Sequence, residues 1–504
     1  MEDYKNNFIG FLLETGALKI GGDYSLKSKR ISPWFVNIGD FNDGKSTATL
    51  GRFYADSIIN SGEKVDILYG IPEKGVGLAI ATSIGMAGKG KNVPWFFTRK
   101  FAKDHGEYSS LSQADRIKAM TVGRAPKDGQ CMVQLDDVFT AGNAKYEARA
   151  ELETLGDFRY PLLAIAVDRQ EVGIDGKSAI EEYENKTGTK VVSVVNALDI
   201  VTFLKGYLAP SANRDGIYGA DGKVLLKDED IVRGVSRMTN YLRVYGTDTA
   251  HETLGKFPEQ KIVGRDKSII PACDVPTIEQ FDKLVEATAN IEEVGAYKVG
   301  FELGLTYGLP EVVETVRRHT KKPIIYDHQK AATDIPDTGK NFARVCSDAG
   351  IDSIILFPQA GPETERAWIY HALDHGLKVI VGGRMTHPAY AQSEGGFISD
   401  EGAMEMYRIA ARAGINDFVV PGNKAPVIEK VYNLVDAEGV DPIFYAPGFV
   451  SQGGKIEDAT KVAGNRWHAI VGRGIYNPKK KANVLDTTVE EMREAALEHA
   501  KALA

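Results

Sequence analysis

Residues 296–303 read AYKVGFEL, and residues 322–329 read KPIIYDHQ. Each is a short apolar run that ends in charged or polar side chains, the pattern of a buried parallel strand. Similar runs flank them, separated by amphipathic segments such as Thr277–Ala289 and Pro310–His319. These runs are SIIPACDV at 268–275, SIILFPQA at 353–360, KVIVGGRM at 378–385, DFVVPGN at 417–423, IFYAPGF at 443–449 and HAIVGRGI at 468–475. Eight such units in roughly 235 residues predict one (β/α)8 TIM barrel, whose chemistry lies at the carboxyl ends of the strands.

Residues 1–205 predict a second kind of α/β domain. Their strand candidates are Val65–Tyr69, Trp95–Thr98, Cys131–Leu135 and Leu162–Val167. So few strands, each followed by a glycine-, aspartate- or charge-rich turn, favour an open sheet with its site at the strand ends.

Residues 206–262 are interpreted as a connector between the domain at 1–205 and the barrel at 263–504. Apolar residues recur there at helical spacing behind Asp228, a candidate N-cap, which predicts one amphipathic helix. They are Ile231, Val235, Met238, Leu242 and Tyr245. The segment shows no catalytic motif.

The bulk properties narrow the classes of function. The 504 residues are 43% hydrophobic, enough for separate cores, and carry a net charge of −8. This acidity argues against nucleic acid or an anionic membrane as a partner. The cysteines Cys131, Cys273 and Cys346 are widely spaced, which favours free thiols in a reducing compartment. Without a secretory signal or an apolar run of about 20 residues, the chain is expected to be soluble and cytoplasmic.

Residues 133–144, VQLDDVFTAGNA, place two carboxylates and a small-residue loop directly after an apolar strand. Thr140, Ala141, Gly142 and Asn143 lead into a helix, so their backbone N–H groups and the helix N-terminus suit a phosphate. Asp136 and Asp137 suit ribose hydroxyls or a positive charge that develops on the sugar. A solvated acidic turn is the alternative, but the whole run favours a sugar-phosphate site.

With this loop, four further stretches make residues 5–205 resemble the type I phosphoribosyltransferases, and specifically the orotate phosphoribosyltransferases. SLKSKRISP at 25–33 resembles the substrate segment of that family, and YGIPEKG at 69–75 resembles its pyrophosphate loop. TRKFAKDHGE at 98–107 resembles the mobile catalytic loop, although Tyr108-Ser109-Ser110 follows where the family has glycines. DRQE at 168–171 resembles a motif on the orotate side.

The resemblance implies transfer of a 5-phosphoribosyl group from phosphoribosyl pyrophosphate to orotate, with Mg2+ carried by the pyrophosphate. Asp136 and Asp137 would face the sugar, and Arg169 would hold the planar orotate anion. The cations for the leaving pyrophosphate would be Lys27, Lys74, Arg99, Lys100, Lys103 and His105.

The barrel carries acids and lysines at its predicted strand ends: Asp274, Lys298, Asp327, Lys330 and Asp334. Alternating carboxylates and ammonium groups keep one another charged in a dry pocket, where a lone lysine would lose its charge. An ordinary salt bridge explains any single member, but the set points to a site.

Residues 263–500 resemble the orotidine 5'-monophosphate decarboxylases, whose Asp-Lys-Asp array Asp327, Lys330 and Asp334 match. The usual spacing is D-x-K-x-x-D, and here each gap holds one extra residue. We expect the array to survive on a bulged backbone. The resemblance implies cofactor-free decarboxylation, with Lys330 as the proton donor. It also implies a homodimer, in which Asp334 and Thr338 reach across the interface.

Other barrel positions match the substrate contacts of that family. Asp274 would contact the sugar, and Lys298 would position Asp327. Thr386, in a Thr-His-Pro stretch, resembles the loop that touches the pyrimidine. The phosphate would be held by Gln452, Gly453, Gly472 and Arg473.

Together these resemblances imply consecutive steps: orotate and phosphoribosyl pyrophosphate give orotidine 5'-monophosphate, which loses CO2 to give uridine 5'-monophosphate. Two alternatives stay open. The barrel could be a metal-dependent sugar-phosphate decarboxylase, which metal dependence would reveal. The N-terminal domain could be a ligand-binding regulator, although a regulator has no need of Lys100, Lys103 and His105.

Overall fold

The computed structural model describes residues 2–99, 112–139, 142–173, 175–208, 216–254, 261–328, 331–448 and 466–503. The chain forms two compact units. The first comprises Met1–Leu242 and Gly246–Leu254, and the second comprises Arg243–Tyr245 and Gly255–Ala504. In the described ranges, no helix has the length and apolar character needed to cross a membrane.

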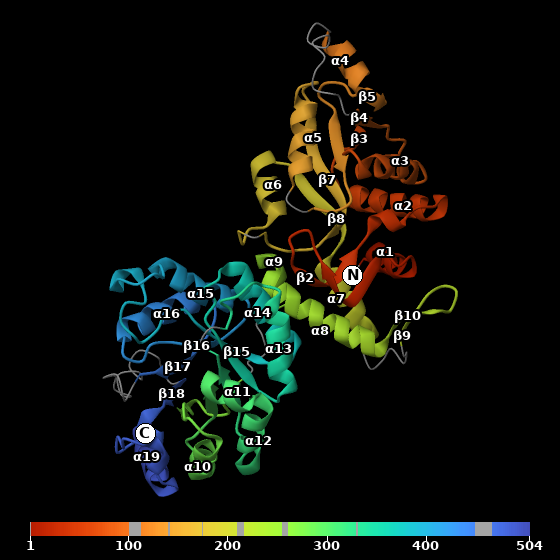
Figure 1. Cartoon of the computed structure of the whole chain (residues 1–504). Coiled ribbons are helices and arrows are strands. Elements are labelled where there is room, and N and C mark those ends of the chain that lie inside the picture. The colour runs from red at the N-terminus through yellow and green to blue at the C-terminus, as the bar shows by residue number, and fades with distance from the viewer. Residues whose placement is uncertain are drawn as a thin grey trace. The chain divides into compact units, whose positions relative to one another are not determined.

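The first unit is built on an open, mixed sheet, as predicted (Figure 1). Among the described residues its strand order is β5-β4-β3-β6-β7-β8, and only β5 runs antiparallel to its neighbour. The strands are β3 (Ile67–Gly70), β4 (Trp95–Thr98), β5 (Thr121–Gly123), β6 (Cys131–Leu135), β7 (Arg159–Asp168) and β8 (Lys190–Asn196). The four predicted strands are present, whereas β5 and β8 were not predicted. Two hairpins accompany the sheet: β1 (Leu18–Ser25) with β2 (Ile31–Val36), and β9 (Gly216–Tyr218) with β10 (Val224–Lys227).

Helices cover both faces of this sheet (Figure 1). One apolar core joins α1, α2, α3, α7 and α8, and the other lies under α5 and α6. These helices are α1 (Asp3–Glu14), α2 (Gly44–Asn60), α3 (Lys74–Ala87), α5 (Asn143–Glu153), α6 (Ala179–Thr187), α7 (Ala197–Tyr207) and α8 (Asp228–Tyr245). Two shorter helices are α4 (Gln113–Met120) and α9 (Asp248–Leu254), and a 3-10 turn spans Ile38–Asp40.

The amphipathic helix predicted between residues 206 and 262 is α8. Its apolar residues Ile231, Val235, Met238 and Leu242 belong to the core of the first unit. Asp228 is the first helical residue rather than the N-cap, and Lys227 at the N-cap position makes no side-chain capping bond.

The second unit is the predicted barrel. In the described part of the chain, eight parallel strands follow one another in the order β11-β18-β17-β16-β15-β14-β13-β12. The ends of this sheet meet where the Cys273 amide donates to the Lys298 carbonyl (2.8 Å) and Ala272 bridges Lys298. The strands are β11 (Lys267–Pro271), β12 (Tyr297–Gly300), β13 (Ile324–Asp327), β14 (Ser353–Leu356), β15 (Lys378–Gly382), β16 (Asp417–Val419), β17 (Ile443–Pro447) and β18 (Trp467–Val471). All eight predicted strands are therefore confirmed.

Helices follow the barrel strands (Figure 1). Several begin at a side-chain cap, such as the Thr277 hydroxyl that accepts from the Gln280 amide. The helices are α10 (Ile278–Thr288), α11 (Phe301–Tyr307), α12 (Leu309–His319), α13 (Thr338–Asp348), α14 (Pro362–Asp374), α15 (Asp400–Arg412), α16 (Ala425–Ala437), α18 (Arg473–Tyr476) and α19 (Val489–Lys501). The 3-10 turns Gln392–Glu394 and Val484–Asp486 lie between them.

The barrel interior is apolar apart from a few paired polar groups. Its core cluster includes Ile270, Tyr445 and Ile470, and strand alternation turns Ser268, Asp417 and His468 to the same side. The Tyr445 hydroxyl donates to Asp417 (2.8 Å), and the Ser268 hydroxyl bonds the His468 ring (2.8 Å). Burial raises the pKa of Asp417 to about 7 and lowers that of His468 to about 3. These pairs satisfy groups that would otherwise be costly to bury.

Replacing Asp417 should make stability less sensitive to pH. The pKa of this carboxyl rises from 3.8 to about 7 on burial, so between those values the folded chain holds a proton that the unfolded chain has lost. Stability from this group is therefore greatest at low pH and falls as the pH rises through that window. Asp417→Asn keeps an acceptor for Tyr445, and we expect it to gain stability relative to wild type as the pH rises from about 5 to about 8. Urea unfolding of the full chain measures the difference, and a difference independent of pH would contradict this prediction.

Candidate functional site

In the first unit, a carboxylate pair lies at the carboxyl end of β6. Asp136 is 7% exposed, and its carboxylate contacts the ammonium of Lys145 at 2.5 Å. The Tyr54 hydroxyl donates to the backbone carbonyl of Asp136 (2.8 Å). Burial raises the pKa of Asp136, Lys145 lowers it, and neighbouring Asp137 raises it again. The pair is therefore a buried, charge-compensated group rather than a solvated turn.

Asp137 faces the predicted pyrophosphate loop. The Lys74 ammonium, at the first position of α3, forms an ion pair with its carboxylate. Glycine makes this approach possible, since a Cβ on Gly75 would lie 2.2 Å from the carbonyl oxygen of Leu135 at the end of β6. The structure thus brings the predicted Lys74 and Asp137 together.

The predicted phosphate loop ends at the start of a helix. Gly142 adopts φ +75° as the N-cap of α5, and Asn143 is the first helical residue. Free N–H groups and the positive end of the helix dipole are thereby presented near the carboxylate pair. Thr140 and Ala141 lie outside the described residues.

The predicted orotate-side arginine lies against the N-terminal substrate segment. The Arg169 guanidinium stacks on Trp34, with 4.1 Å to the ring centroid, and donates to the Ser32 hydroxyl (2.8 Å). Glu171 accepts a hydrogen bond from its Nε (2.8 Å). Two motifs some 135 residues apart in the sequence thus meet around one guanidinium.

The other predicted cations of this unit that the structure describes are exposed. Lys27 is exposed on the turn between β1 and β2, and Arg99 is exposed after β4. Neither contacts another predicted site residue among those the structure describes. Lys100, Lys103 and His105 lie outside the described residues.

In the barrel, Lys298 lies close to two of the predicted acids. Its buried ammonium donates to Asp327 (2.7 Å) and lies 3.8 Å from Asp274. Burial alone would lower the pKa of Lys298, but the two carboxylates more than offset this and raise it above its usual value. Oδ1 of Asp327 is buried and has no hydrogen-bond partner among the described residues.

The widened spacing after Asp327 coincides with an unusual backbone. Ala332 has φ +65°, a left-handed conformation that non-glycine residues rarely adopt. The Ala331 carbonyl accepts from the Phe357 amide (3.2 Å), which anchors this stretch to the end of β14. Such a bend is consistent with the predicted bulge, although Lys330 lies outside the described residues.

Asp334 is exposed on the stretch between β13 and α13, and Thr338 is the first residue of α13. The Thr364 hydroxyl donates to the backbone carbonyl of Asp334 (3.0 Å), and the Trp368 indole donates to that of Ile335 (3.2 Å). Helix α14 therefore fixes this stretch. Among the described residues, neither predicted side chain contacts Lys298 or Asp327.

The loop after β15, which carries Thr386, is fixed by a buried arginine, Arg384. Arg384, 7% exposed, bonds Asp400 at 2.5 Å and Glu394 at 3.0 Å. Hydrogen bonds from Ser393, helped by Arg384, lower the pKa of Asp400 to about 2. The start of this loop is therefore joined by ion pairs to residues 10 and 16 positions later.

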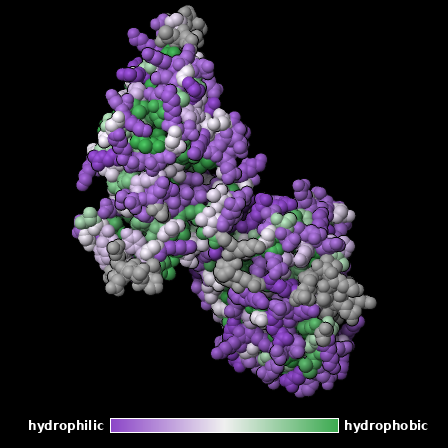
Figure 2. Space-filling model, turned by 180° about the vertical axis from the view of Figure 1, so that it is seen from behind, coloured by the Kyte–Doolittle hydropathy of each residue, from purple (hydrophilic) through white to green (hydrophobic). Residues whose placement is uncertain are grey.

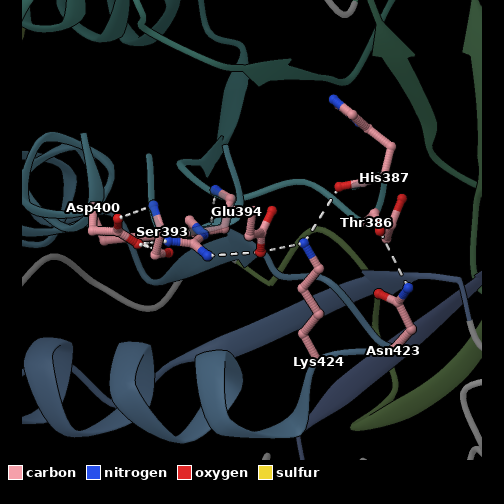
Figure 3. Close-up of polar contacts among 9 residues, drawn as sticks. Thr386, His387, Ser393, Glu394, Asp400, Asn423 and Lys424 are labelled. Atoms are coloured by element: carbon pink, nitrogen blue, oxygen red, sulfur yellow. Dashed lines mark hydrogen bonds and ion pairs between the residues drawn. The ribbon is translucent and has the colours of Figure 1, made fainter. Parts of the chain in front are cut away.

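The next loop along the barrel supports Thr386 directly. Figure 3 shows the Lys424 ammonium reaching Glu394 (2.7 Å) and the His387 carbonyl (3.3 Å). The Asn423 amide donates to the Thr386 carbonyl (3.2 Å). The loops after β15 and β16 thus form one polar assembly.

The predicted phosphate loops are only partly described. Gln452 and Gly453 lie outside the described residues. Gly472 and Arg473 begin α18 directly after β18. Burial raises the pKa of Tyr476, Asp274 raises it further, and Arg473 and Lys298 lower it. This end of β18 therefore lies within electrostatic range of the Lys298 cluster.

Several residues of these sites were not predicted from the sequence. They are Tyr54, Lys145, Arg384, Asn423 and Lys424. Lys145 stands three residues after Gly142 and could have been proposed as the cation that a buried Asp136 requires. Tyr54, Asn423 and Lys424 contact partners at least 30 residues away, for which local spacing gives no signal. Arg384 contacts Glu394 and Asp400, 10 and 16 residues later, across an irregular loop.

Known proteins are similar to each half of the chain. Residues 267–487 match the model of the orotidine 5'-phosphate decarboxylase / HUMPS family. The chain is 43% identical over 207 residues to an orotate phosphoribosyltransferase of Thioalkalivibrio sulfidiphilus, which covers 41% of this chain and 90% of the relative. It is 41% identical over 207 residues to that of Pseudomonas paraeruginosa, covering 41% of this chain and 91% of the relative.

Similar solved structures exist for both halves. One is an orotate phosphoribosyltransferase of Francisella tularensis, with TM-score 0.37 and 30% identity over 48% of this chain and 100% of that one. The other is an orotidine 5'-monophosphate decarboxylase of Methanocaldococcus jannaschii bound to the inhibitor BMP, with TM-score 0.40 and 25% identity over 47% of this chain and 98% of that one.

Fold, site and relatives define the class: a phosphoribosyltransferase unit fused to a decarboxylase barrel. The chain belongs to the orotate phosphoribosyltransferase family, and residues 267–487 form a domain of the orotidine 5'-phosphate decarboxylase / HUMPS family.

Lys298 should be essential for the stability of the barrel as well as for its site. Lys298→Met leaves Asp327 buried without its ammonium partner, and breaking a buried ion pair in this way costs about 3–5 kcal/mol. We expect a loss of that order in urea unfolding of the second unit. Adding Asp327→Asn should restore part of it, because no unpaired charge then remains buried. Equal stability of the single and double variants would contradict this account.

Proposed function

We propose that this chain converts orotate to uridine 5'-monophosphate in two steps, by phosphoribosyl transfer in the first unit and decarboxylation in the second. One observation carries the proposal: a chain of the orotate phosphoribosyltransferase family continues into an orotidine 5'-phosphate decarboxylase domain. The product of the first reaction is the substrate of the second. The assigned segments are 1–205 for the transferase and 263–504 for the decarboxylase.

In the transferase, the bond from the anomeric carbon to pyrophosphate breaks as a bond to the orotate ring nitrogen forms. Positive charge develops on the sugar, which Asp136 and Asp137 would stabilise. The N-terminus of α5, with the loop from Thr140 to Asn143, would hold the 5'-phosphate. Arg169, stacked on Trp34, would hold orotate.

Cations would stabilise the leaving pyrophosphate. Lys74 already lies beside Asp137, at the edge where the leaving group would form. The further cations of this proposal are Lys27, Arg99, Lys100, Lys103 and His105.

The transferase step would use Mg2+ that arrives with the pyrophosphate. In the described ranges, no three His, Cys, Asp or Glu side chains gather as a metal site. Asp136 and Asp137 are oxygen ligands of the kind that Mg2+ accepts, but each is already paired with a lysine. Bound Mg2+ would neutralise charge on the pyrophosphate oxygens.

In the decarboxylase, CO2 leaves and the ring carbon takes up a proton, without a cofactor. Lys330 as an ammonium would stabilise the developing carbanion and donate that proton. Asp327 would lie next to the substrate carboxylate, held by Lys298 at 2.7 Å. Oδ1 of Asp327, which has no hydrogen-bond partner among the described residues, supports a second partner there.

Binding energy from the rest of the nucleotide would hold the ring in place. Asp274 would contact the sugar, and Thr386 would contact the pyrimidine on the loop that Asn423 supports. Gln452, Gly453, Gly472 and Arg473 would hold the phosphate.

A homodimer of the barrel forms part of the proposal. The surface in Figure 2 is mostly hydrophilic, with small hydrophobic areas. Phe301 and Leu305 of α11 are 54% and 74% exposed, and Ile335, beside Asp334, is 59% exposed. They follow the neighbouring strands β12 and β13, so they lie at one edge of the barrel. Covering them by a second copy would bring Asp334 and Thr338 into an interface. The three buried free cysteines support a reducing, cytoplasmic location.

Release of labelled CO2 from carboxyl-labelled orotate tests the whole proposal. With phosphoribosyl pyrophosphate and Mg2+ we expect release, and excess EDTA should stop it because transfer fails. CO2 release from orotidine 5'-monophosphate should persist in EDTA. Loss of that second activity in EDTA would favour a metal-dependent decarboxylase. Orotate left untouched with Mg2+ present would favour a regulatory first domain.

Lys330→Ala should separate the two activities. We expect it to abolish CO2 release while orotidine 5'-monophosphate accumulates at the wild-type rate, because only the proton donor of the second unit is lost. Product analysis by chromatography distinguishes the two nucleotides. Substantial CO2 release by this variant would remove Lys330 from the proton-donor role.

A further inference from the structure

The helix α8, which carries no catalytic motif, contacts the orotate side of the first unit through a polar side chain. Tyr241 is fully buried, and its hydroxyl donates to the Glu171 carboxylate (3.2 Å). Glu171 in turn pairs with Arg169, with 2.7 Å between Nη2 and the carboxylate. A chain of two contacts therefore runs from α8 to the guanidinium that we assign to orotate.

The Arg169 guanidinium has protein contacts at its ring-stacked face and at two of its three nitrogens. Its face lies on Trp34, its Nε is bonded to Glu171, and its Nη2 is bonded to Ser32. Among the described residues, Nη1 has no hydrogen-bond partner. A planar anion can therefore approach this one nitrogen, provided that Glu171 keeps the group in this orientation.

The chain just after α8 holds the same motif through its backbone. The Thr247 amide donates to the Gln170 carbonyl (2.9 Å), and Gly246 forms an antiparallel bridge with Glu171. Gly246 has no room for a side chain, since a Cβ would lie 2.1 Å from the Leu242 carbonyl oxygen. Tyr241, Gly246 and Thr247 thus each contact residues 170–171.

A second polar residue of α8 holds the part of β1 that leads into the substrate segment. Arg237, 6% exposed, donates to the carbonyls of Gly21 and Gly22 (2.8 and 2.9 Å) and to Asp23 (2.6 Å). These residues lie in the irregular part of β1, ahead of the turn that carries Lys27. Helix α8 therefore contacts both Glu171 and the strand ahead of the substrate segment.

We propose that Tyr241 is a positioning residue of the transferase site, which orients Arg169 toward orotate through Glu171. The inference rests on the proposed function and deepens it, because it makes α8 part of the orotate-binding side rather than a connector. Tyr241 touches no substrate. Its loss should weaken orotate binding and leave the phosphoribosyl pyrophosphate side intact.

Steady-state kinetics of the full chain test this. Losing one hydrogen bond to a charged group predicts that Tyr241→Phe raises the KM for orotate about tenfold or more. The KM for phosphoribosyl pyrophosphate should stay within about twofold, because no contact on that side changes. Decarboxylation of added orotidine 5'-monophosphate should be unchanged, which provides an internal control for the same preparation.

Tyr183→Phe is the matched control. Tyr183 is also fully buried in the first unit, and its hydroxyl donates to Gln134 (3.1 Å), away from Arg169. It should lose comparable stability without a selective change in the orotate KM. Glu171→Gln should raise the orotate KM, and adding Tyr241→Phe to it should have little further effect, because both act through one carboxylate.

The outcomes separate the two proposals. If wild type transfers to orotate but Tyr241→Phe leaves its KM unchanged, or raises both substrate KM values equally, the positioning role is overturned and the proposed function stands. Fully additive effects of Tyr241→Phe and Glu171→Gln would also overturn it. A wild-type chain that leaves orotate untouched would overturn the proposed function, and this inference with it.

Discussion

Both units depend on one kind of interaction. A buried carboxylate at the carboxyl end of a strand has its charge compensated by a lysine. Asp136 pairs with Lys145, Asp137 with Lys74, and Asp327 with Lys298. An ionised carboxylate without such a partner would cost several kcal/mol to bury and would take up a proton instead. Parallel strands bring these ends to one edge, but the lysines make it possible for the charges to remain there.

The need to compensate these buried charges explains features that no single strand or helix explains by itself. Gly75 allows α3 to approach the end of β6 so closely that Lys74 reaches Asp137. In the barrel, Lys298 lies between Asp274 and Asp327, so each acid limits where the ammonium can move. A side chain held in this way is already ordered, so little further conformational entropy would be lost when a ligand binds beside it.

The sequence predicted the parts of the fold that depend on local pattern. The barrel strands are continuous apolar runs of regular spacing, and all eight are present. The strand β5 is three residues long and gives no such pattern, and the hairpin β1–β2 is mixed in polarity. The run at 190–196, which forms β8, is apolar enough to have been proposed. Lys298 meets Asp327, as expected, and Lys74 meets Asp137, which was not expected. Each of these residues is fixed by the strand or helix end beside it.

What the sequence could not predict are contacts between distant segments. The apolar stripe of α8 predicts a helix that buries one face, and the structure confirms it. Nothing in that stripe says which core it joins, nor that Tyr241 at its edge meets a carboxylate 70 residues earlier. Periodicity reports the apolar residues that drive packing, whereas the direction of a single hydroxyl depends on the final placement of both elements. A segment without a motif can therefore contact residues far from it in the sequence, and only the folded chain reveals such contacts.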